Sequence, residues 1–146
     1  MNTTLNHSTG QVPNWRQHLL RVVFVLNFIG LAFDNWSTVL YPGEQLDPWS
    51  GVAISFYAAF SLLCLLGIRF PLKFLPLLMI QLIYKSAWMV STYLPAYQLN
   101  QMDESLSSWF WVMVPGIIID LLVIPWGFVY REYLKYFFRK EAQSFG

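Results

Sequence analysis

Four stretches of predominantly apolar residues dominate the sequence, and each has about the 20 residues that an α-helix needs to cross a bilayer. They cover residues 19–41, 49–68, 74–94 and 109–130. Charged residues make up only 12% of the 146 positions, whereas an ordinary soluble domain carries roughly 25%. The sequence therefore predicts an all-α fold, a four-helix transmembrane bundle. It excludes a disordered chain, a solenoid and a soluble enzyme with a charged surface.

We expect one transmembrane domain with a polar segment at each end. Residues 1–18 form a polar N-terminal tail, residues 19–130 contain the four spans, and residues 131–146 form a basic tail. Asp47 followed by Pro48 is a helix-start signal, an N-cap side chain and then a proline in the first turn. Pro95 is expected to end the third span, and prolines within the fourth predict a bent helix.

The distribution of charge predicts how the chain is oriented. Eight of the nine Lys and Arg residues lie before or at the very start of the first stretch, between the second and third, or after the fourth. The two remaining loops contain Glu44, Asp47, Asp103 and Glu104 and no basic residue. Because basic loops stay in the cytoplasm, we predict that both termini are cytoplasmic and that the protein is a multi-pass protein of the cell inner membrane.

The ninth basic residue, Lys85, lies in the middle of the third stretch, and Asp120 lies in the middle of the fourth. At a rise of about 1.5 Å per residue each is roughly 15 Å deep, counted from opposite faces, so both lie near the midplane. A lone charge there costs roughly 2.5–3.5 kcal/mol on insertion scales. Because the third and fourth stretches are expected to be antiparallel neighbours, we predict an ion pair between Lys85 and Asp120.

Further side chains are expected around this pair. Asp34, in the first stretch, lies roughly 6 Å from the midplane, within reach of a flexible lysine stem. Gln81 and Trp88 share a helical face with Lys85, because they lie four residues before it and three residues after it. Gly116 opens room beside the carboxyl group four positions later. The predicted ligand-binding site consists of Lys85, Asp120, Asp34, Gln81 and Trp88.

The sequence leaves three classes of function open. The first is a non-enzymatic membrane protein that binds or transports a small or lipid-like molecule at this polar site. The second is a structural or accessory subunit in which Lys85 and Asp120 form an ion pair that fixes helix register, and which binds a membrane-protein partner or another copy of itself. The third is an enzyme acting on a lipid or quinone. No nucleophile–base set is visible, so we predict no enzymatic activity.

The sequence offers few residues for a cofactor or a metal. Cys64 is the single cysteine, so no intramolecular disulfide or paired-cysteine redox centre can form. His7 and His18 both precede the first stretch, so no histidine pair can hold a haem between transmembrane helices. The net charge of +1 gives no basis for nucleic-acid binding. We predict no cofactor, no metal site and no nucleic-acid partner. The lipid bilayer is the environment in which we expect the protein to lie.

Two further patterns indicate contacts outside the polar site. One face of the second stretch carries the small residues Gly51, Ser55 and Ala59. Such a stripe predicts close approach of a neighbouring helix, more readily within the chain than between copies. One face of the C-terminal tail carries the basic residues Arg131, Lys135 and Arg139. That stripe is typical of a helix lying along anionic headgroups.

Residues 51–90 and 120–135 resemble a family of uncharacterised bacterial four-helix membrane proteins. That family shares a tryptophan-flanked lysine in its third helix and an I-P-W-x-x-V ending to its fourth. The matching residues here are Lys85, Trp88, Ile124, Pro125, Trp126 and Val129. The resemblance covers roughly residues 20–135 and implies a bacterial inner-membrane protein, without implying an activity. The four-helix layout is also similar to that of DoxX-like proteins.

Overall fold

The computed structural model describes residues 12–43 and 45–135, and all regular structure in these ranges is helical. The four longest helices are α1 (Asn14–Leu40), α2 (Pro48–Arg69), α3 (Leu75–Trp88) and α5 (Glu104–Val123). The shorter segments are the π-helices η1 (Met89–Tyr93) and η2 (Tyr130–Leu134) and the α-helices α4 (Leu94–Gln98) and α6 (Trp126–Val129). The predicted all-α fold is confirmed.

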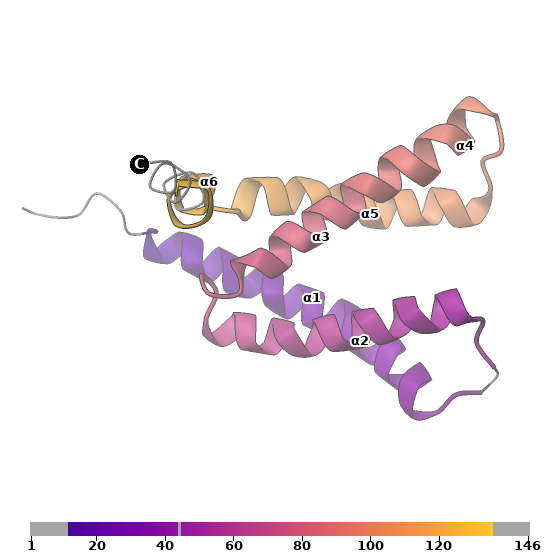
Figure 1. Cartoon of the computed structure of the whole chain (residues 1–146), viewed down its shortest axis with the longest axis horizontal. Helices are drawn as coiled ribbons and strands as arrows, with labels where there is room; N and C mark the ends of the chain where they lie inside the picture. Colours follow the sequence, from indigo (N-terminus) through magenta and orange to yellow (C-terminus); the bar gives the residue numbers. More distant parts are fainter. Residues whose placement is uncertain (1–11, 44, 136–146) are drawn as a thin grey trace, which may run out of the picture.

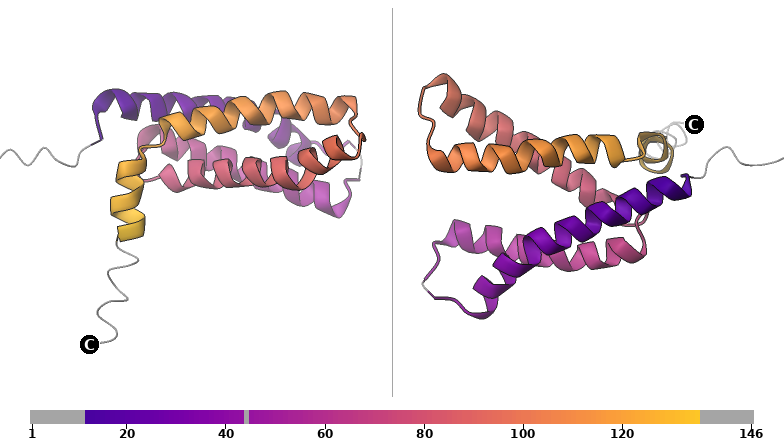
Figure 2. Two further views of the ribbon diagram at one scale, coloured as in Figure 1. Left: turned by 90° about the horizontal axis from the view of Figure 1, so that it is seen from above. Right: turned by 180° about the vertical axis from the view of Figure 1, so that it is seen from behind.

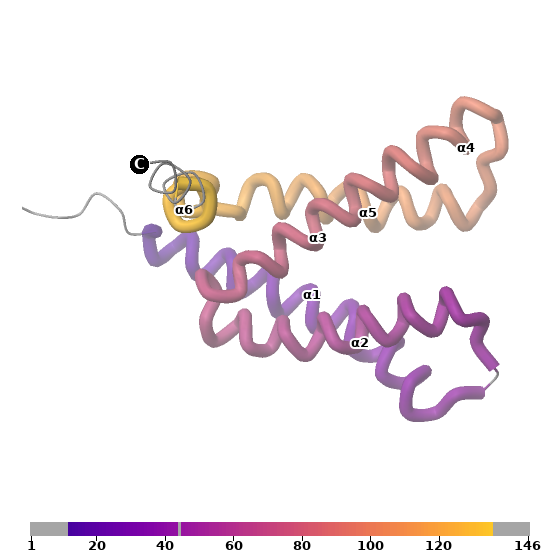
Figure 3. The backbone as a smooth tube through the Cα atoms, in the orientation of Figure 1, coloured from indigo at the N-terminus to yellow at the C-terminus, as the bar shows by residue number. Residues whose placement is uncertain are grey.

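Among the described residues, three helices are long and apolar enough to cross a membrane: α1, α2 and α5. The 22 residues of α2 extend over about 33 Å, slightly more than the roughly 30 Å of a bilayer's hydrocarbon core. Helix α3 has only 14 residues, but η1 and α4 continue it without a break, as the tube in Figure 3 shows. These lengths and compositions indicate that the chain associates with a membrane.

The prediction that Pro95 ends the third stretch is wrong. The helical rod passes through Pro95 and ends at Gln98. Pro95 falls in the first turn of α4, where a missing backbone N–H matters least, and η1 precedes it. The wider i→i+5 turn of a π-helix shifts the hydrogen-bond register at this point, so the proline is accommodated within the rod.

Two aspartates begin helices by accepting backbone N–H groups. The carboxylate of Asp47 accepts from Trp49 N at 3.0 Å and Ser50 N at 3.1 Å, which confirms the predicted start of α2. Asp103 accepts from Leu106 N at 2.7 Å. Because this second cap lies upstream of the apolar run, α5 begins at Glu104 rather than at the predicted residue 109.

The fourth span was predicted to reach residue 130, and this is also wrong. Helix α5 continues through Pro115 and ends at Val123. Ile124 then has ψ 121°, as expected for a residue that precedes a proline, and Pro125 is the N-cap residue of α6. In the left view of Figure 2, the yellow α6 and η2 turn away from α5 and run across the end of the other helices. Arg139 of the predicted basic stripe lies outside the described residues.

The long helices form two hairpins, α1 with α2 and α3–α4 with α5 (Figure 1). The hairpins meet near the turn at residues 70–74 and spread apart toward the loops at their other end, as both Figure 1 and the right view of Figure 2 show. Within the first hairpin, Trp36 Nε1 donates to Ser61 Oγ and to the Ala58 carbonyl, both at 3.1 Å. The spread of the hairpins decides which polar residues can meet.

The small-residue face that packs against α1 is not the predicted one. Ser55 and Ala59 are exposed, so the predicted stripe faces away from the chain. The buried small residues of α2 are Ala58, Ser61, Cys64 and Gly67. A Cβ on Gly67 would overlap the ring of Phe24, so the close approach of α1 depends on this glycine.

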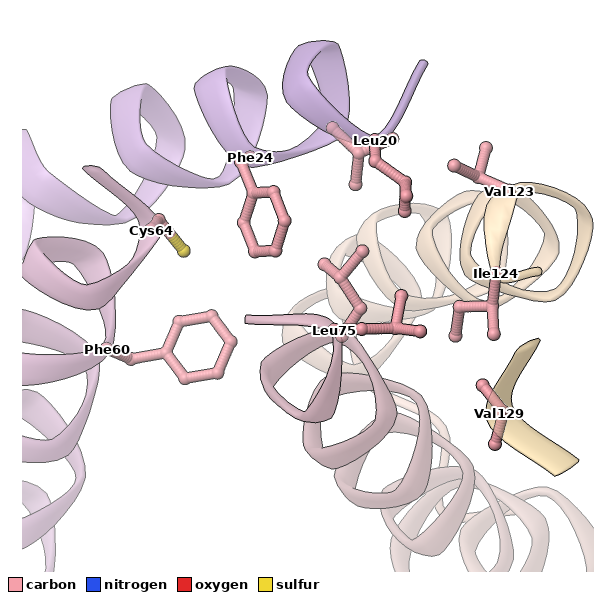
Figure 4. Close-up of a cluster of buried hydrophobic side chains, with 10 residues drawn as sticks. Leu20, Phe24, Phe60, Cys64, Leu75, Val123, Ile124 and Val129 are labelled. Carbon is pink, nitrogen blue, oxygen red and sulfur yellow. The ribbon is translucent and has the colours of Figure 1, made fainter. Parts of the chain in front are cut away.

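The apolar core lies where the two hairpins meet. It contains Leu20 and Phe24 of α1, which are completely buried, and reaches across to residues of the other hairpin. Figure 4 shows its labelled members: Leu20, Phe24, Phe60, Cys64, Leu75, Val123, Ile124 and Val129. Every long helix and the short α6 contribute to it, so this cluster joins the two hairpins and fixes the depth at which the polar residues of α3 and α5 face each other.

Candidate functional site

A cluster of polar side chains lies between α1, α3 and α5. Gln81 and Lys85 occupy one face of α3, and Asp120 faces them from α5; they are 3%, 7% and 1% exposed. Burial this complete is rare for charged residues unless they are paired. Gln81, Lys85 and Asp120 were all predicted to share a site, and the structure brings the three together.

Lys85 and Asp120 form the predicted ion pair. The distance between Nζ and Oδ2 is 3.8 Å, longer than the roughly 2.7–3.2 Å of an N–H···O hydrogen bond. Both oxygens of Asp120 are buried, and within the described part of the chain neither has a hydrogen-bond partner. The pair is therefore a contact between charges that leaves the hydrogen-bonding capacity of the carboxylate unused.

Gly116 makes room for the lysine. A Cβ on Gly116 would overlap Nζ of Lys85 and would come within 3.1 Å of its Cε. The ammonium group thus lies against the backbone of α5, one helical turn before Asp120. The space predicted at Gly116 is present, and the lysine side chain itself occupies part of it.

Asn27 of α1 is a member of the cluster that the sequence reasoning missed. Its Oδ1 accepts a hydrogen bond from Nε2 of Gln81 at 2.8 Å, which ties the first hairpin to the second. Oε1 of Gln81 is buried and has no partner among the described residues. The sequence did contain an indication of this role. Asn27 is a polar residue in the middle of an apolar stretch, at a depth similar to that of Gln81.

A small cavity adjoins these groups. Its volume is about 70 Å³, and its polar lining comes from Asn27, Gln81, Lys85 and Asp120, with apolar walls that include Val23 and Ile119. A water molecule takes about 30 Å³ in the liquid, so the cavity holds about two waters or a polar group of that size. Donors (Lys85, Gln81) and acceptors (Asp120, Asn27) both face it.

Two predicted site residues lie elsewhere. Asp34 is exposed and does not line the cavity, so the expectation that it joins the pair is wrong. It is seven residues beyond Asn27, about 10 Å further along α1, where the first hairpin has diverged from α3 and α5. Trp88 belongs to an aromatic group in the second hairpin: its ring centroid lies 6.2 Å from that of Tyr93, which stacks on Phe110 at 4.6 Å.

Comparison with protein-family models, with curated proteins and with solved structures gives no match to the chain. The resemblance to four-helix bacterial membrane proteins stays a prediction. Within residues 12–43 and 45–135, no three His, Cys, Asp or Glu side chains come together as a metal-binding group. The chemistry of the site therefore rests on one carboxylate, one ammonium group and two amides.

Proposed function

We propose that the chain is a four-span protein of the inner membrane that binds or transports a small molecule, or the polar end of a lipid-like molecule. The binding groups are Lys85 and Asp120, assisted by Asn27 and Gln81. In this role Lys85 holds an anionic or carbonyl group and Asp120 accepts a hydrogen bond or a proton. Asp34 and Trp88, which lie outside the cluster, are not included.

The proposed topology has four spans, with both termini in the cytoplasm. The continuous rod of α3, η1 and α4 serves as the third span beside α1, α2 and α5. The cytoplasmic placement of both termini is supported by where the described chain ends lie. They are at the same end of the molecule as the basic turn at residues 69–73 (Figure 1). The acidic loops lie at the other end, as the positive-inside rule requires.

The observation that carries the proposed binding role is the unused hydrogen-bonding capacity of Asp120. A buried polar group without a partner costs roughly 1–3 kcal/mol, and more if it is charged, so a purely structural carboxylate is expected to acquire partners. Here neither oxygen has a hydrogen-bond partner in the described part of the chain, and a cavity lies beside them. Intramembrane ionisable groups in such a setting mark binding sites or ion pathways.

The size of the cavity limits what can enter. A volume of about 70 Å³ admits water, a small ion or one polar group, and it does not admit a whole metabolite. A larger ligand would therefore place only its polar end at Lys85 and Asp120. Its apolar part would stay in the surrounding hydrocarbon.

A structural role is the second candidate, and one observation favours it. The close contact between the Lys85 ammonium group and Gly116 is the packing expected of a pair that sets helix register. In that case the cluster would be dry, and the protein would act as an accessory subunit. The two candidates differ in whether polar molecules reach the cluster.

Cysteine accessibility separates the two candidates. In a Cys64→Ala background, Asn27→Cys places a thiol on the cavity wall, and Gly30→Cys places one on the exposed side of the same helix, with no atom within 4 Å. We expect Ag⁺, a thiol-reactive ion small enough for this cavity, to react with Asn27→Cys at least tenfold faster than with Gly30→Cys, because lipid surrounds the second position. Adding Gly116→Ala to the Asn27→Cys variant should slow labelling at residue 27, since the new methyl group displaces the Lys85 side chain into the cavity.

Equal, slow labelling at both positions would contradict binding or transport, because a polar group that reaches Lys85 needs a path that the small reagent can also follow. That outcome would favour the accessory subunit. Labelling that is fast at residue 27 and unaffected by Gly116→Ala would place the entry path away from Lys85 and would remove the lysine from the proposed site.

A further inference from the structure

A second cavity lies at the end of the molecule where the described chain begins and ends. Its volume is about 430 Å³. Arg16 of α1 lines one side, and Gly127, Tyr130 and Arg131 of α6 and η2 line the other; Val12 and Phe128 are among its apolar walls. It is separate from the polar cluster around Lys85, with which it shares no lining residue.

Arg16 is held in position but keeps one donor unused. Its Nη2 donates to the Leu122 carbonyl near the end of α5, at 3.3 Å. Its Nε is buried and has no acceptor within the described ranges. Because Nε has almost no accessible surface, an anion in the cavity would bind the outer N–H groups of the same guanidinium.

The surroundings of Arg16 are electropositive. Helix α1 begins at Asn14 with no side-chain cap and no acidic residue in its first turn, so the positive end of its dipole stays uncompensated by a local carboxylate. Arg131 adds a second guanidinium to the lining, and none of the described lining residues is Asp or Glu. This arrangement favours an anion over a cation or a neutral polar group.

The cavity is amphiphilic as well as basic. Val12, Pro13 and Phe128 provide apolar surface beside the arginines. Trp15 and Trp126, neighbours of the lining residues in the chain, are 62% and 44% exposed, as expected for side chains in the interfacial zone of a bilayer. An anion with an attached apolar body fits such a cavity better than a free anion does.

We propose that this cavity binds the phosphate headgroup of an anionic phospholipid. Arg16 contacts the phosphate, and the apolar walls receive the glycerol and the upper part of an acyl chain. The assignment to the cytoplasmic leaflet rests on the proposed topology. Arginine suits this role because its planar fork donates two parallel hydrogen bonds to a phosphate.

Native mass spectrometry of the full chain tests the proposal without removing any existing contact. The protein is purified in detergent and mixed with equal amounts of phosphatidylglycerol and phosphatidylcholine. A Cβ on Gly127 would meet no atom within 4 Å, so Gly127→Glu introduces a negative charge into the cavity lining without a steric clash. We expect this variant to lower bound phosphatidylglycerol by about tenfold, whereas the neutral control Gly127→Gln retains it.

Three further variants protect the test against misfolding. Arg16→Gln should lower phosphatidylglycerol binding, Arg16→Lys should lower it less, and Lys73→Gln, which removes a positive charge outside the cavity at the same end, should leave it unchanged. Equal losses for Arg16→Gln and Lys73→Gln would overturn the site in favour of diffuse attraction. Equal binding of the two lipids would also overturn it, as would displacement of the lipid by inorganic phosphate.

The outcome is distinguishable from failure of the proposed function. A reporter fused to the C-terminus that proves external would overturn the topology and move the headgroup to the other leaflet, while the Gly127 result would stand. Conversely, a normal topology and fast labelling of Asn27→Cys, combined with no effect of Gly127→Glu, would overturn the lipid site alone.

Discussion

The polar cluster lies on α1, α3 and α5, three of the helices that also form the apolar core, yet the two regions are packed in opposite ways. In the core, Leu20, Phe24 and Leu75 are completely buried among apolar neighbours. One to two helical turns away, the cluster around Lys85 and Asp120 contains a small cavity and three buried oxygens that have no hydrogen-bond partner among the described residues. The core has the arrangement expected of a part that holds the hairpins together, and the cluster does not.

This difference indicates what each region contributes. Helix association inside a membrane depends on close packing and on interhelical hydrogen bonds, because lipid tails are as apolar as the side chains. The core, together with the bonds from Trp36 to α2, supplies both. The charged pair is therefore expected to add little to folding, which agrees with the binding role proposed for it.

The largest effect should come from the core. Phe24→Ala removes a completely buried ring that packs over Gly67, and leaves a cavity between the hairpins. We expect the free energy of unfolding to fall by about 3–5 kcal/mol. The matched control is Phe33→Ala, on the same helix but 82% exposed, which should change it by less than about 0.5 kcal/mol.

Unfolding in mixed detergent micelles, followed by tryptophan fluorescence, measures both variants. Similar small losses for Phe24→Ala and Phe33→Ala would break the comparison on which the argument depends. The core would then not be the part that joins the hairpins, and the polar cluster would have to be considered for that role.

Replacing the charged pair should have an intermediate effect that depends on how many charges remain. Either Lys85→Met or Asp120→Leu alone leaves a charge without its counter-ion, at a cost of roughly 2.5–3.5 kcal/mol. The double replacement removes both charges. It should return the free energy of unfolding to within about 1 kcal/mol of the original chain, because apolar side chains can replace a buried ion pair with little loss.

The double replacement separates the two candidate functions. A double variant that stays more than about 2 kcal/mol less stable than the original would show that the pair is required for folding, as in an accessory subunit. If the double variant is stable but Asn27→Cys is no longer labelled in it, the two charges serve to keep the site hydrated and are not needed for folding.

The sequence alone predicted those parts of the site that depend on how far a residue lies from the end of its helix. Lys85 and Asp120 lie at matching distances from opposite ends of neighbouring helices, and counting residues along a helix gives that distance directly. Gln81 followed from its spacing of four residues from Lys85. These relations are local to one helix or one hairpin, so they do not require knowledge of how the hairpins are arranged.

The remaining parts depend on geometry between elements. Whether Asp34 or Asn27 meets Gln81 depends on how far the hairpins diverge along α1, and no local pattern encodes that angle. The continuation of the rod past Pro95 depends on a π-helical turn, which has no simple sequence signal. The small-residue face of α2 was misassigned because two stripes with similar spacing exist and only the contact with α1 distinguishes them.

A second carboxylate, that of Asp47, extends the comparison to single hydrogen-bonding groups. Asp47 begins α2, and, unlike Asp120, it has its donors: Trp49 N and Ser50 N lie 3.0 and 3.1 Å from Oδ1. Hydrogen bonds from the side chain and backbone of Ser50 hold the pKa of Asp47 below its ordinary value of 3.8. Because the folded pKa is the lower one, the stabilisation by this cap is fully present above 3.8 and is lost as the pH falls through the folded value.

We therefore expect the amide proton shifts of Trp49 and Ser50 to stay constant from pH 7 to pH 5 and then to titrate with a midpoint below 3.8. Asp47→Asn, which keeps the capping oxygen, should abolish the titration and leave the start of α2 intact. Solution NMR in detergent gives both results. A titration midpoint at or above 3.8 would mean that the Asp47 cap adds no stability. The hydrogen bonds to Asp47 would then give this carboxylate no advantage over one that has no donor among the described residues, such as Asp120.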